Sequence, residues 1–263
     1  MIKVAISGAC GRMGRRLIDL VHADDELELT AAVDAAGHPD AGKDAGELAG
    51  IGSIGIPVTS EVPDSANVLI EFSAPEPTVE HALFCAEHGI AAVLGTTGLS
   101  PEQKRAVESA ARKTAVLPAP NMSVGVNVAF EAAALLAKAL GDDYDVEIVE
   151  MHHRLKKDAP SGTARGFAER VANALHRDLS KDAVYGREGL VGERPQGQIG
   201  IHAVRGGDVV GEHRVIFSAL GERIELVHIA QNRDVFVRGA IRAAKAIAGK
   251  PPGLYTVNEL VMG

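Results

Sequence analysis

The feature that most constrains the fold of this chain is a regular alternation of short apolar runs with helical patterns over its first 120 or so residues. Strand–helix alternation at this spacing predicts a parallel β-sheet with helical crossovers. The expected elements are strands at residues 3–7, 29–34, 68–73, 91–95 and 115–118, and helices at residues 12–22, 77–88 and 101–113.

A glycine-rich turn, residues 8–14, joins the first expected strand to the first expected helix. Its Gly-x-x-Gly-x-x-Gly spacing is a variant of the dinucleotide fingerprint, in which glycines let the backbone approach a pyrophosphate and let the helix pack on the sheet. A glycine triad is a weak signal in a chain with 29 glycines. Its position between a strand and a helix strengthens it, and we therefore predict a site for a dinucleotide cofactor.

Asp34 ends the second expected strand, twenty residues after Gly14. An acid in this place accepts hydrogen bonds from the adenosine ribose hydroxyls, whereas the competing interpretation is a solvated carboxylate. Residues 35–37 are Ala-Ala-Gly and include no arginine that could pair with a 2′-phosphate. The sequence therefore favours NADH, while arginines in the expected helix at residues 12–22 leave NADPH use open.

Two later loops follow the fourth and fifth expected strands, at residues 95–98 and 119–123. Ligands of open parallel sheets bind outside the carboxyl ends of the strands. Taken singly, Thr96, Thr97 and Asn121 are ordinary turn residues. Together, their hydroxyl, amide and backbone groups predict contacts with the nicotinamide end of the cofactor.

The pattern changes after a long alanine-rich helix. Strand patterns separated by glycine-rich turns predict a mixed or antiparallel sheet with helices on one face. We expect two domains, residues 1–123 with 234–263 and residues 124–233. The elements expected in this part are helices at residues 127–140, 161–175 and 233–248, strands at 146–151, 199–204, 212–218 and 223–229, and a long loop at 178–198.

The segment at residues 150–163, Glu-Met-His-His-Arg-Leu-Lys-Lys-Asp-Ala-Pro-Ser-Gly-Thr, joins an expected strand to an expected helix. Histidine titrates near neutral pH, lysine is a strong cation, and a helix N-terminus offers free N–H groups to an anion. A lone histidine is more often a packing residue, and a metal site lacks a third ligand at suitable spacing. The segment predicts a site that binds an anion and moves a proton.

Composition excludes several classes of partner. The chain carries 27 Lys and Arg against 35 Asp and Glu, a net charge of −8, which disfavours nucleic acid and anionic membranes. Aromatic residues make up 3% and tryptophan is absent, which argues against a base-stacking surface. Two cysteines without metal-ligand spacing, and no signal peptide or long apolar span, predict a cytoplasmic protein with reduced thiols.

These motifs resemble the 4-hydroxy-tetrahydrodipicolinate reductase (dihydrodipicolinate reductase) family. The resemblance covers essentially the whole chain and rests on residues 8–14, 95–98, 150–154, 156–163 and 201–213. It implies an α/β fold, with an N-terminal Rossmann-type domain and an α+β domain with a mixed sheet for substrate binding and oligomerisation. It also implies reduction of a cyclic imine dicarboxylate by NADH or NADPH, on the diaminopimelate route to lysine, by a homotetramer built through its C-terminal sheet.

The resemblance assigns roles residue by residue. It implies that His152 is catalytic and Lys156 donates a proton, and that His153, Gly162 and Thr163 contact a substrate carboxylate. One departure is Ala35, where some relatives carry arginine, which weakens the case for NADPH. The implied cofactor contacts are Gly8, Ala9, Cys10, Gly11, Arg12, Met13, Asp34, Gly95, Thr96, Thr97, Ala119, Pro120, Asn121 and Met122.

The expected chemistry is hydride transfer to the substrate ring, with a proton from the pair formed by Lys156 and His152. One carboxylate would bind the N–H groups of Gly162 and Thr163, helped by the hydroxyl of Ser161. Arg233 is a weaker candidate for the other carboxylate.

Two alternative functions compete with this hypothesis. Another two-domain oxidoreductase, such as an amino-acid or sugar dehydrogenase, would share the glycine turn but would not require residues 160–163 after a histidine pair. A dinucleotide-sensing module would bind NADH without turnover, and the intact His152 and Lys156 argue against it.

Overall fold

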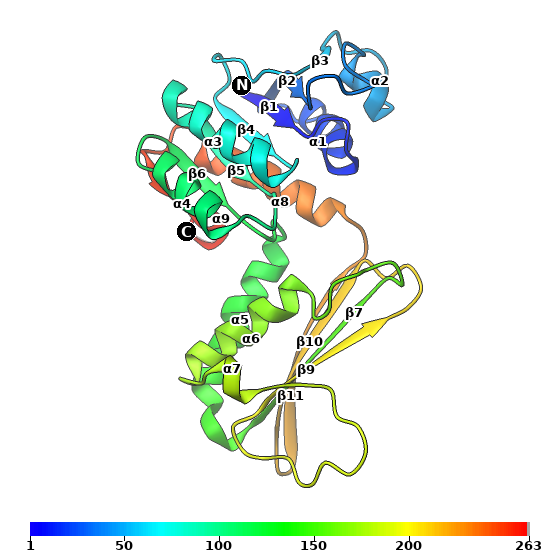
Figure 1. Ribbon diagram of the computed structural model, residues 1–263, viewed down its shortest axis with the longest axis vertical. Coiled ribbons are helices and arrows are strands. Elements are labelled where there is room, and N and C mark those ends of the chain that lie inside the picture. The colour runs from blue at the N-terminus through cyan, green and yellow to red at the C-terminus, as the bar shows by residue number, and fades with distance from the viewer. Residues whose placement is uncertain (262–263) are drawn as a thin grey trace. The chain divides into compact units, whose positions relative to one another are not determined.

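The computed structural model describes residues 1–261, which form two compact units. The first unit comprises Met1–Val124 and the segment that begins at Asp234, and the second comprises Gly125–Arg233 (Figure 1). The sequence placed the first boundary one residue earlier. Residues 262 and 263, which the prediction assigned to the first domain, lie outside the described residues.

The first unit contains a seven-stranded sheet in which every recorded pairing is parallel. The strand order is β12-β6-β5-β4-β1-β2-β3, so the order reverses between β1 and β4. Such a reversal is where open parallel sheets bind ligands. The strands are β1 (Ile2–Ser7), β2 (Leu27–Val33), β3 (Val58–Thr59), β4 (Val68–Glu71), β5 (Ala91–Leu94), β6 (Ala115–Pro118) and β12 (Gly253–Leu254).

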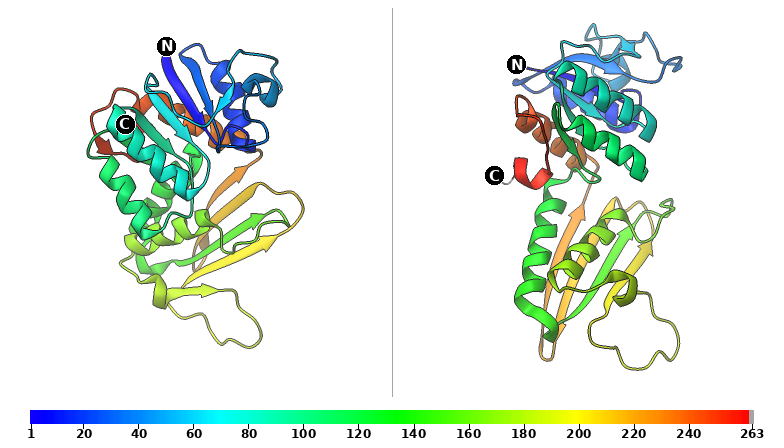
Figure 2. Two further views of the ribbon diagram at one scale, coloured as in Figure 1. Left: turned by 45° about the horizontal axis from the view of Figure 1, so that its top comes forward. Right: turned by 60° about the vertical axis from the view of Figure 1, so that its left-hand side comes forward.

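Helices cover both faces of this sheet (Figures 1 and 2). Successive strand residues point to opposite faces, and Val4 and Ile6 of β1 pack with one pair of helices while Ala5 packs with another. The first pair is α1 (Arg12–His22) and α8 (Asp234–Ile247), and the second is α3 (Pro75–His88) and α4 (Pro101–Ala110). The smaller helices are α2 (Ala45–Ala49) and α9 (Val257–Val261).

The second unit contains a mixed five-stranded sheet of order β11-β10-β7-β9-β8. Strand β10 pairs antiparallel with β7 and β11, whereas β9 pairs parallel with β7 and β8. The strands are β7 (Asp145–His152), β8 (Ala183–Tyr185), β9 (Ile199–Arg205), β10 (Gly211–Ala219) and β11 (Glu222–Ala230).

Two long helices, α5 (Val124–Leu140) and α6 (Gly162–Ala174), pack on one face of the mixed sheet (Figure 2). Phe130 of α5 and Phe167 of α6 meet edge to face, with ring centroids 4.7 Å apart, above the inward residues Val146 and Ile148 of β7. The expected arrangement of a mixed sheet with helices on one face is confirmed.

The element prediction was wrong at residues 178–198. The expected loop at residues 178–198 contains α7 (Leu179–Asp182) and the short strand β8, which adds to the sheet edge beside β9. Glu147 on the outer face of β7 holds this segment, because Arg187 donates to it bidentately at 2.9 and 3.1 Å and Arg194 donates at 2.9 Å. These contacts span about 40 residues or more, so no local pattern reveals them.

The expectation of no long apolar span also needs correction. Helix α5 with its following turn, Val124–Asp143, is long and apolar enough to cross a membrane by length and composition alone. One side of α5, which includes Val126, Ala133 and Ala137, is buried in the core of the second unit. An alanine-rich core helix passes the same test as a membrane span.

Candidate functional site

The turn between β1 and α1 is closely packed and needs its glycines. Gly8 has a φ of +76°, and a Cβ there would lie 2.3 Å from the carbonyl oxygen of Phe72. A Cβ at Gly14 would lie 2.1 Å from the carbonyl oxygen of Gly8. Gly11 is the N-cap of α1 and has no side chain that could make a capping hydrogen bond. The cap residue therefore does not cover the positive end of the helix.

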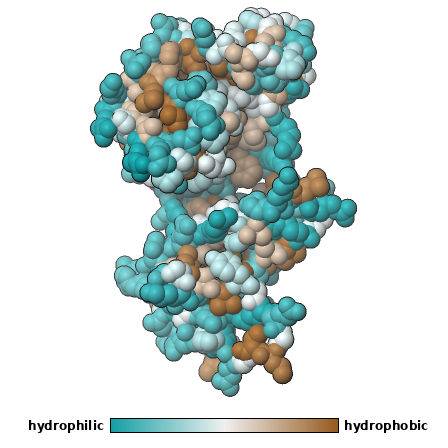
Figure 3. Space-filling model, in the orientation of Figure 1, coloured by the Kyte–Doolittle hydropathy of each residue, from teal (hydrophilic) through white to brown (hydrophobic). Residues whose placement is uncertain are grey.

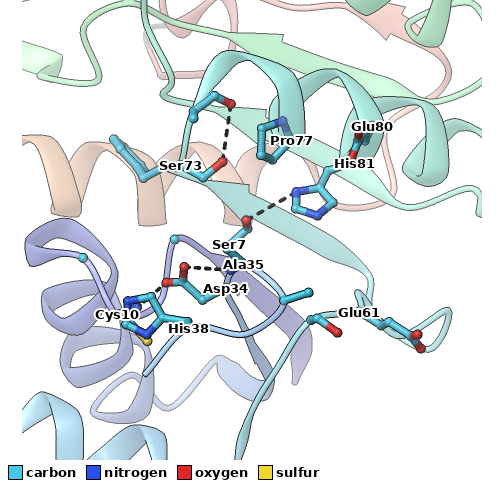
Figure 4. A pocket seen from close by; sticks show the side chains of 16 residues that line it. Ser7, Cys10, Asp34, Ala35, His38, Glu61, Ser73, Pro77, Glu80 and His81 are labelled. Carbon is cyan, nitrogen blue, oxygen red and sulfur yellow. Dashed lines mark hydrogen bonds between the residues drawn. The ribbon is translucent and has the colours of Figure 1, made fainter. Parts of the chain in front are cut away.

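A cavity of about 750 Å³ lies beside this turn (Figure 4). Of the predicted cofactor contacts, Gly8, Cys10, Gly11 and Asp34 line it. Close backbone approach, an uncapped helix start and a carboxylate at the end of β2 fit a dinucleotide. The lining residues that sequence reasoning missed are Ser7, Ala35, Ala36, His38, Ser60, Glu61, Phe72, Ser73, Ala74, Pro77, Glu80 and His81.

Asp34 is held in place by two backbone donors. The N–H of Cys10 donates to Oδ2 and the N–H of Ala35 donates to Oδ1, each at 2.8 Å. Figure 4 shows Asp34 beside Cys10 and His38 on one side of the cavity. Each carboxylate oxygen has two lone pairs, so Asp34 can still accept hydrogen bonds from ribose hydroxyls.

The rest of the predicted turn contacts differ in what they can offer. Ala9 is fully buried, and its N–H donates to the carbonyl oxygen of Val33 at 3.0 Å. Arg12 is exposed and Met13 is half-buried. Burial and the nearby carboxylate of Asp34 raise the pKa of Cys10 to about 11, so its thiol is protonated at neutral pH.

The predicted nicotinamide-side residues do not line the cavity. A Cβ at Gly95 would lie 2.4 Å from the ring of Phe72, and Thr96 Oγ1 is buried without a recorded hydrogen-bond partner. Ala119 and Met122 are buried in the core of the first unit. Pro120 and Thr97 are exposed, and Asn121 Oδ1 accepts from the N–H of Ser123 at 2.9 Å.

A buried carboxylate lies under another wall of the cavity. Glu71 ends β4, is fully buried, and has Oε2 2.5 Å from Nδ1 of His81. Its Oε1 accepts from the N–H of Ser73 at 2.9 Å, and Ser7 Oγ lies 3.3 Å from His81 Nδ1. The pair fixes the ring of His81 at the cavity wall.

In the second unit, the site is organised by Glu150 at an inward position of β7. This carboxylate is fully buried. It accepts from both terminal nitrogens of Arg205 at 2.8 and 2.9 Å and from the N–H of Ser161 at 3.0 Å, and it lies 2.6 Å from His152 Nδ1. Burial alone would raise the pKa of Glu150, but hydrogen bonds from Arg205, His152 and Ser161 outweigh it and lower the pKa.

His152 is neutral at physiological pH because burial lowers its pKa, despite the opposing effect of Glu150. Because an ionised carboxylate only accepts, the shared hydrogen belongs to His152 Nδ1, and Nε2 carries the lone pair. A Cβ at Gly211 would lie 3.1 Å from His152 Nε2. The glycine therefore leaves this acceptor nitrogen accessible to a neighbouring group.

Ser161 is the N-cap of α6, and its buried hydroxyl accepts from the N–H of Ala164 at 3.1 Å. The same oxygen lies 3.2 Å from Nε2 of His213, whose ring meets that of His152 edge to face with centroids 5.2 Å apart. Burial lowers the pKa of His213 to about 3, so it is a neutral packing residue. Glu150 and Ser161 thus connect the histidine to the helix start.

The remaining predicted residues of the loop lie around this network. Lys156 Nζ donates to Asp158 Oδ1 at 2.9 Å, and its charge acts on His152. The N–H of His153 donates to the carbonyl oxygen of Val209 at 2.7 Å, while its Nδ1 is buried without a recorded partner. Thr163 is half-buried, and the two remaining predicted residues, Gly162 and Arg233, are exposed.

Comparison with known proteins identifies the family. The model for the N-terminus of dihydrodipicolinate reductase matches residues 2–122, and the model for its C-terminus matches residues 125–261. The chain belongs to the dihydrodipicolinate reductase family.

Relatives over the full length support this membership. Two proteins called 4-hydroxy-tetrahydrodipicolinate reductase, from Citrifermentans bemidjiense and Anaeromyxobacter sp., are 48% and 51% identical. Each match covers 99% of this chain, and 99% and 98% of the relatives. A solved structure of a dipicolinate-bound dihydrodipicolinate reductase from Paenisporosarcina sp. TG-14 matches with a TM-score of 0.78 and 26% identity, covering 99% of both chains.

The predicted dihydrodipicolinate reductase family, the fold class and the assignment as an NAD(P)H-dependent oxidoreductase are therefore confirmed. The roles of single residues stay predictions. Sequence reasoning missed Glu150 and Arg205. One signal was available for Glu150, because an acid at an inward position between Ile148 and His152 of an alternating strand must find partners in the core.

Proposed function

We propose that this chain reduces 4-hydroxy-tetrahydrodipicolinate to tetrahydrodipicolinate with NADH, on the diaminopimelate route to lysine. The product forms with uptake of a hydride and a proton and with loss of water. The observation that carries the proposal is the buried Glu150, which connects Nδ1 of His152 to the start of α6 and leaves Nε2 of the ring as an acceptor. One carboxylate therefore positions both a proton-handling group and an anion site.

A carboxylate of the substrate binds at the N-terminus of α6. The helix is 13 residues long and has no acidic residue in its first turn. Gly162 is exposed, and no atom lies within 4 Å of a Cβ built on it, so a ligand can approach the backbone closely. Backbone N–H groups at the helix start and the positive helix end then stabilise the anion. Ser161 acts through the cap, since its buried hydroxyl is already engaged.

Lys156 donates the proton, and His152 accepts a hydrogen bond. The ammonium group of Lys156 is a donor only, whereas the neutral His152 offers the lone pair of Nε2. His152 can therefore orient Lys156 or a substrate hydroxyl but does not carry a proton to give. Asp158 holds the Lys156 ammonium at 2.9 Å until substrate binds.

The dinucleotide occupies the cavity of the first unit and supplies the hydride when bound. The backbone of residues 8–14 receives the pyrophosphate, and Asp34 accepts from the ribose hydroxyls. NADH is preferred because Asp34 is followed by Ala35 and Ala36, which offer no charge to a 2′-phosphate. The predicted nicotinamide-side contacts, residues 95–97 and 119–122, remain part of this proposal.

The proposal is tested by substituting the two proton-handling residues. Lys156→Ala and His152→Ala should each reduce kcat for the cyclic imine by roughly tenfold or more, because general acid catalysis contributes at least that much. The dissociation constant of NADH, measured by fluorescence titration, should stay within about twofold of the unchanged protein. NADH oxidation with simple 2-oxo acids, but not with the dicarboxylate imine, would instead indicate another dehydrogenase.

We propose that the enzyme is a homotetramer assembled through the mixed sheet. Val204, Val227 and Ile229 lie on the outer face of β9 and β11, opposite α5 and α6, and are 42%, 45% and 55% exposed. On the side drawn in Figure 3, apolar side chains occur in small groups among polar ones. Light scattering should give four times 27.4 kDa, and Ile229→Glu should give a smaller mass.

We also propose a cytoplasmic location. Cys10 and Cys85 are both free thiols, as is usual in a reducing compartment. Fractionation of cells that express the chain should recover it with cytoplasmic marker enzymes.

A further inference from the structure

We propose that Asp40 weakens the binding of NADPH, because it holds Arg15 and Lys43 in ion pairs at the ribose end of the cofactor cavity. This inference rests on the proposed use of the cavity by a dinucleotide. It names a residue that the nucleotide fingerprint does not contain, since Asp40 lies six residues after the ribose acid Asp34.

The contacts connect both cations to Asp40, and one of them also contacts a residue of the cavity wall. Asp40 Oδ2 lies 3.3 Å from Arg15 Nη2, and Asp40 Oδ1 lies 2.6 Å from Lys43 Nζ. Arg15 Nε also donates to the carbonyl oxygen of Cys10 at 2.9 Å, and Cys10 lines the cavity. The guanidinium group therefore contacts the backbone of a residue that lines the cavity.

Asp40 itself lies at the same edge of the cavity. Its N–H donates to His38 Nδ1 at 3.1 Å. A carboxylate oxygen of Asp40, the sulfur of Cys10 and a ring nitrogen of His38 all lie within 4.8 Å of one another. Both His38 and Cys10 line the cavity next to Asp34 (Figure 4).

The charges at this edge oppose a 2′-phosphate. Asp34 and Asp40 contribute two carboxylates, and the two cations that could pair with a phosphate are instead held in ion pairs by Asp40. A phosphate monoester brings a further charge of about −1.5 to −2 at pH 7. NADH places only a hydroxyl here, and Asp34 can accept a hydrogen bond from it. The carboxylates therefore do not oppose the binding of NADH.

Removal of the Asp40 charge should release both cations toward the ribose. Arg15 and Lys43 have side chains that are 43% and 57% exposed, so they can turn to a new partner. Arginine near the ribose acid is the usual means of binding a 2′-phosphate. We therefore expect the effect of Asp40 to fall on NADPH and not on NADH.

The test measures dissociation constants of NADH and NADPH for the full-length protein, by fluorescence titration without substrate. Asp40→Asn and Asp40→Ala should each lower the dissociation constant of NADPH by about tenfold or more, which is the effect of one charge-assisted hydrogen bond. The dissociation constant of NADH should change by less than about threefold. Asp25→Asn removes the same charge from an exposed loop before β2 and should leave both constants unchanged.

Two further variants identify the cause. Arg15→Met and Lys43→Met, each combined with Asp40→Asn, should cancel part of the gain in NADPH affinity and together should abolish it. The proposal is overturned if both Asp40 variants, with melting temperatures equal to that of the unchanged chain, keep its ratio of NADPH to NADH affinity. Equal affinities in the unchanged chain would contradict the proposed NADH preference alone, whereas the effect of Asp40 is the change in that ratio.

Discussion

Glu150 determines which nitrogen of His152 carries the hydrogen. An ionised carboxylate 2.6 Å from Nδ1 stabilises the tautomer with its hydrogen on Nδ1 and leaves Nε2 as the acceptor. The same carboxylate neutralises Arg205, which is tied to the loop of Lys156 through the carbonyl oxygen of Asp158 at 2.7 Å. Glu150 is therefore placed to position both residues that we propose handle the proton, His152 and Lys156.

Glu150→Gln should lower kcat by roughly tenfold or more without changing the NADH dissociation constant by more than about twofold. The amide has the size of the carboxylate but cannot accept from all three partners, so the His152 tautomer is no longer fixed. Nitrogen NMR of His152 should show a shift of the hydrogen toward Nε2, which a loss of stability alone would not produce.

Glu131→Gln is a matched control, because Glu131 pairs with Arg170 at 3.5 Å elsewhere in the same unit. It should leave kcat and the tautomer unchanged. An unchanged kcat in Glu150→Gln, with the tautomer still fixed, would contradict the positioning role.

At the scale of single residues, the sequence identifies candidate site residues that belong to local motifs. It misses residues whose role depends on partners far away in the chain. His152 and Lys156 belong to a recognisable block, so the sequence names them as candidates, and their roles stay predictions. Arg205 approaches Glu150 from 55 residues away, and Asp40 acquires its meaning from Arg15 25 residues earlier. Such pairings follow from strand register and loop path, which composition does not reveal.

At the element scale, the joint between β1 and α1 is set by Gly14. A Cβ here would lie 2.1 Å from the Gly8 carbonyl oxygen and 2.6 Å from Ala9 Cα, both of which are backbone atoms. Helix propensity alone predicts that Gly14→Ala stabilises the chain by about 0.5–1 kcal/mol. Overpacking predicts a loss of about 1–3 kcal/mol.

We expect the cost of overpacking to exceed the gain in helix propensity, because neither backbone atom can move without shifting α1 from the sheet. Gly14→Ala should lower the free energy of unfolding measured in urea and should weaken the binding of NADH. Gly11→Ala is the comparison, since the nearest atom to its Cβ is 3.1 Å away. Equal unfolding free energies for the two variants would show that close packing at Gly14 is not required.

Elements with a strong hydrophobic period were predictable, and short elements were not. Helix α1 has the bounds that the sequence predicts, Arg12–His22. Helix α2 and strand β3 depend on Asp44, which caps α2 and also binds a loop up to 11 residues ahead. The other donors to this one carboxylate are the N–H groups of Gly46, Glu47 and Ile54 and the hydroxyl of Ser53.

For the whole molecule, the buried His213 makes stability depend on pH. Burial lowers its pKa from 6.5 to about 3. Below pH 6.5 the unfolded chain binds a proton at this residue and the folded chain does not, so acid favours unfolding. The contribution of neutral His213 to the free energy of unfolding is complete above pH 6.5 and is lost as the pH falls toward 3. The free energy of unfolding then falls by up to about 1.4 kcal/mol per pH unit.

His213→Gln removes this titration and keeps a donor near Ser161. Between pH 6.5 and 5, its unfolding free energy in urea should fall by about 2 kcal/mol less than that of the unchanged chain. His152 and His228 also have pKa values lowered by burial, but they are present in both proteins. Parallel pH curves for the two proteins would show that His213 is not a source of the acid sensitivity.

The change of sequence pattern predicts a first domain boundary after residue 123, and the first compact unit of the structure runs to Val124. Outward features such as the Glu147 cluster could not be predicted, because a strand with one buried face leaves the other face free to vary. The relative order of β9, β10 and β11 beside β7 likewise depends on pairing that the sequence does not state.

The return of α8 to the first unit has a consequence for synthesis of the chain. Val237, Ala240 and Ala244 are fully buried in the core that also contains β1 and α1, and α8 packs against β4, β5 and β6. These residues follow the whole second unit in the chain, so they leave the ribosome after it. The part of the sheet face that α8 covers therefore stays exposed while the second unit is translated, and during that interval chaperones can bind it.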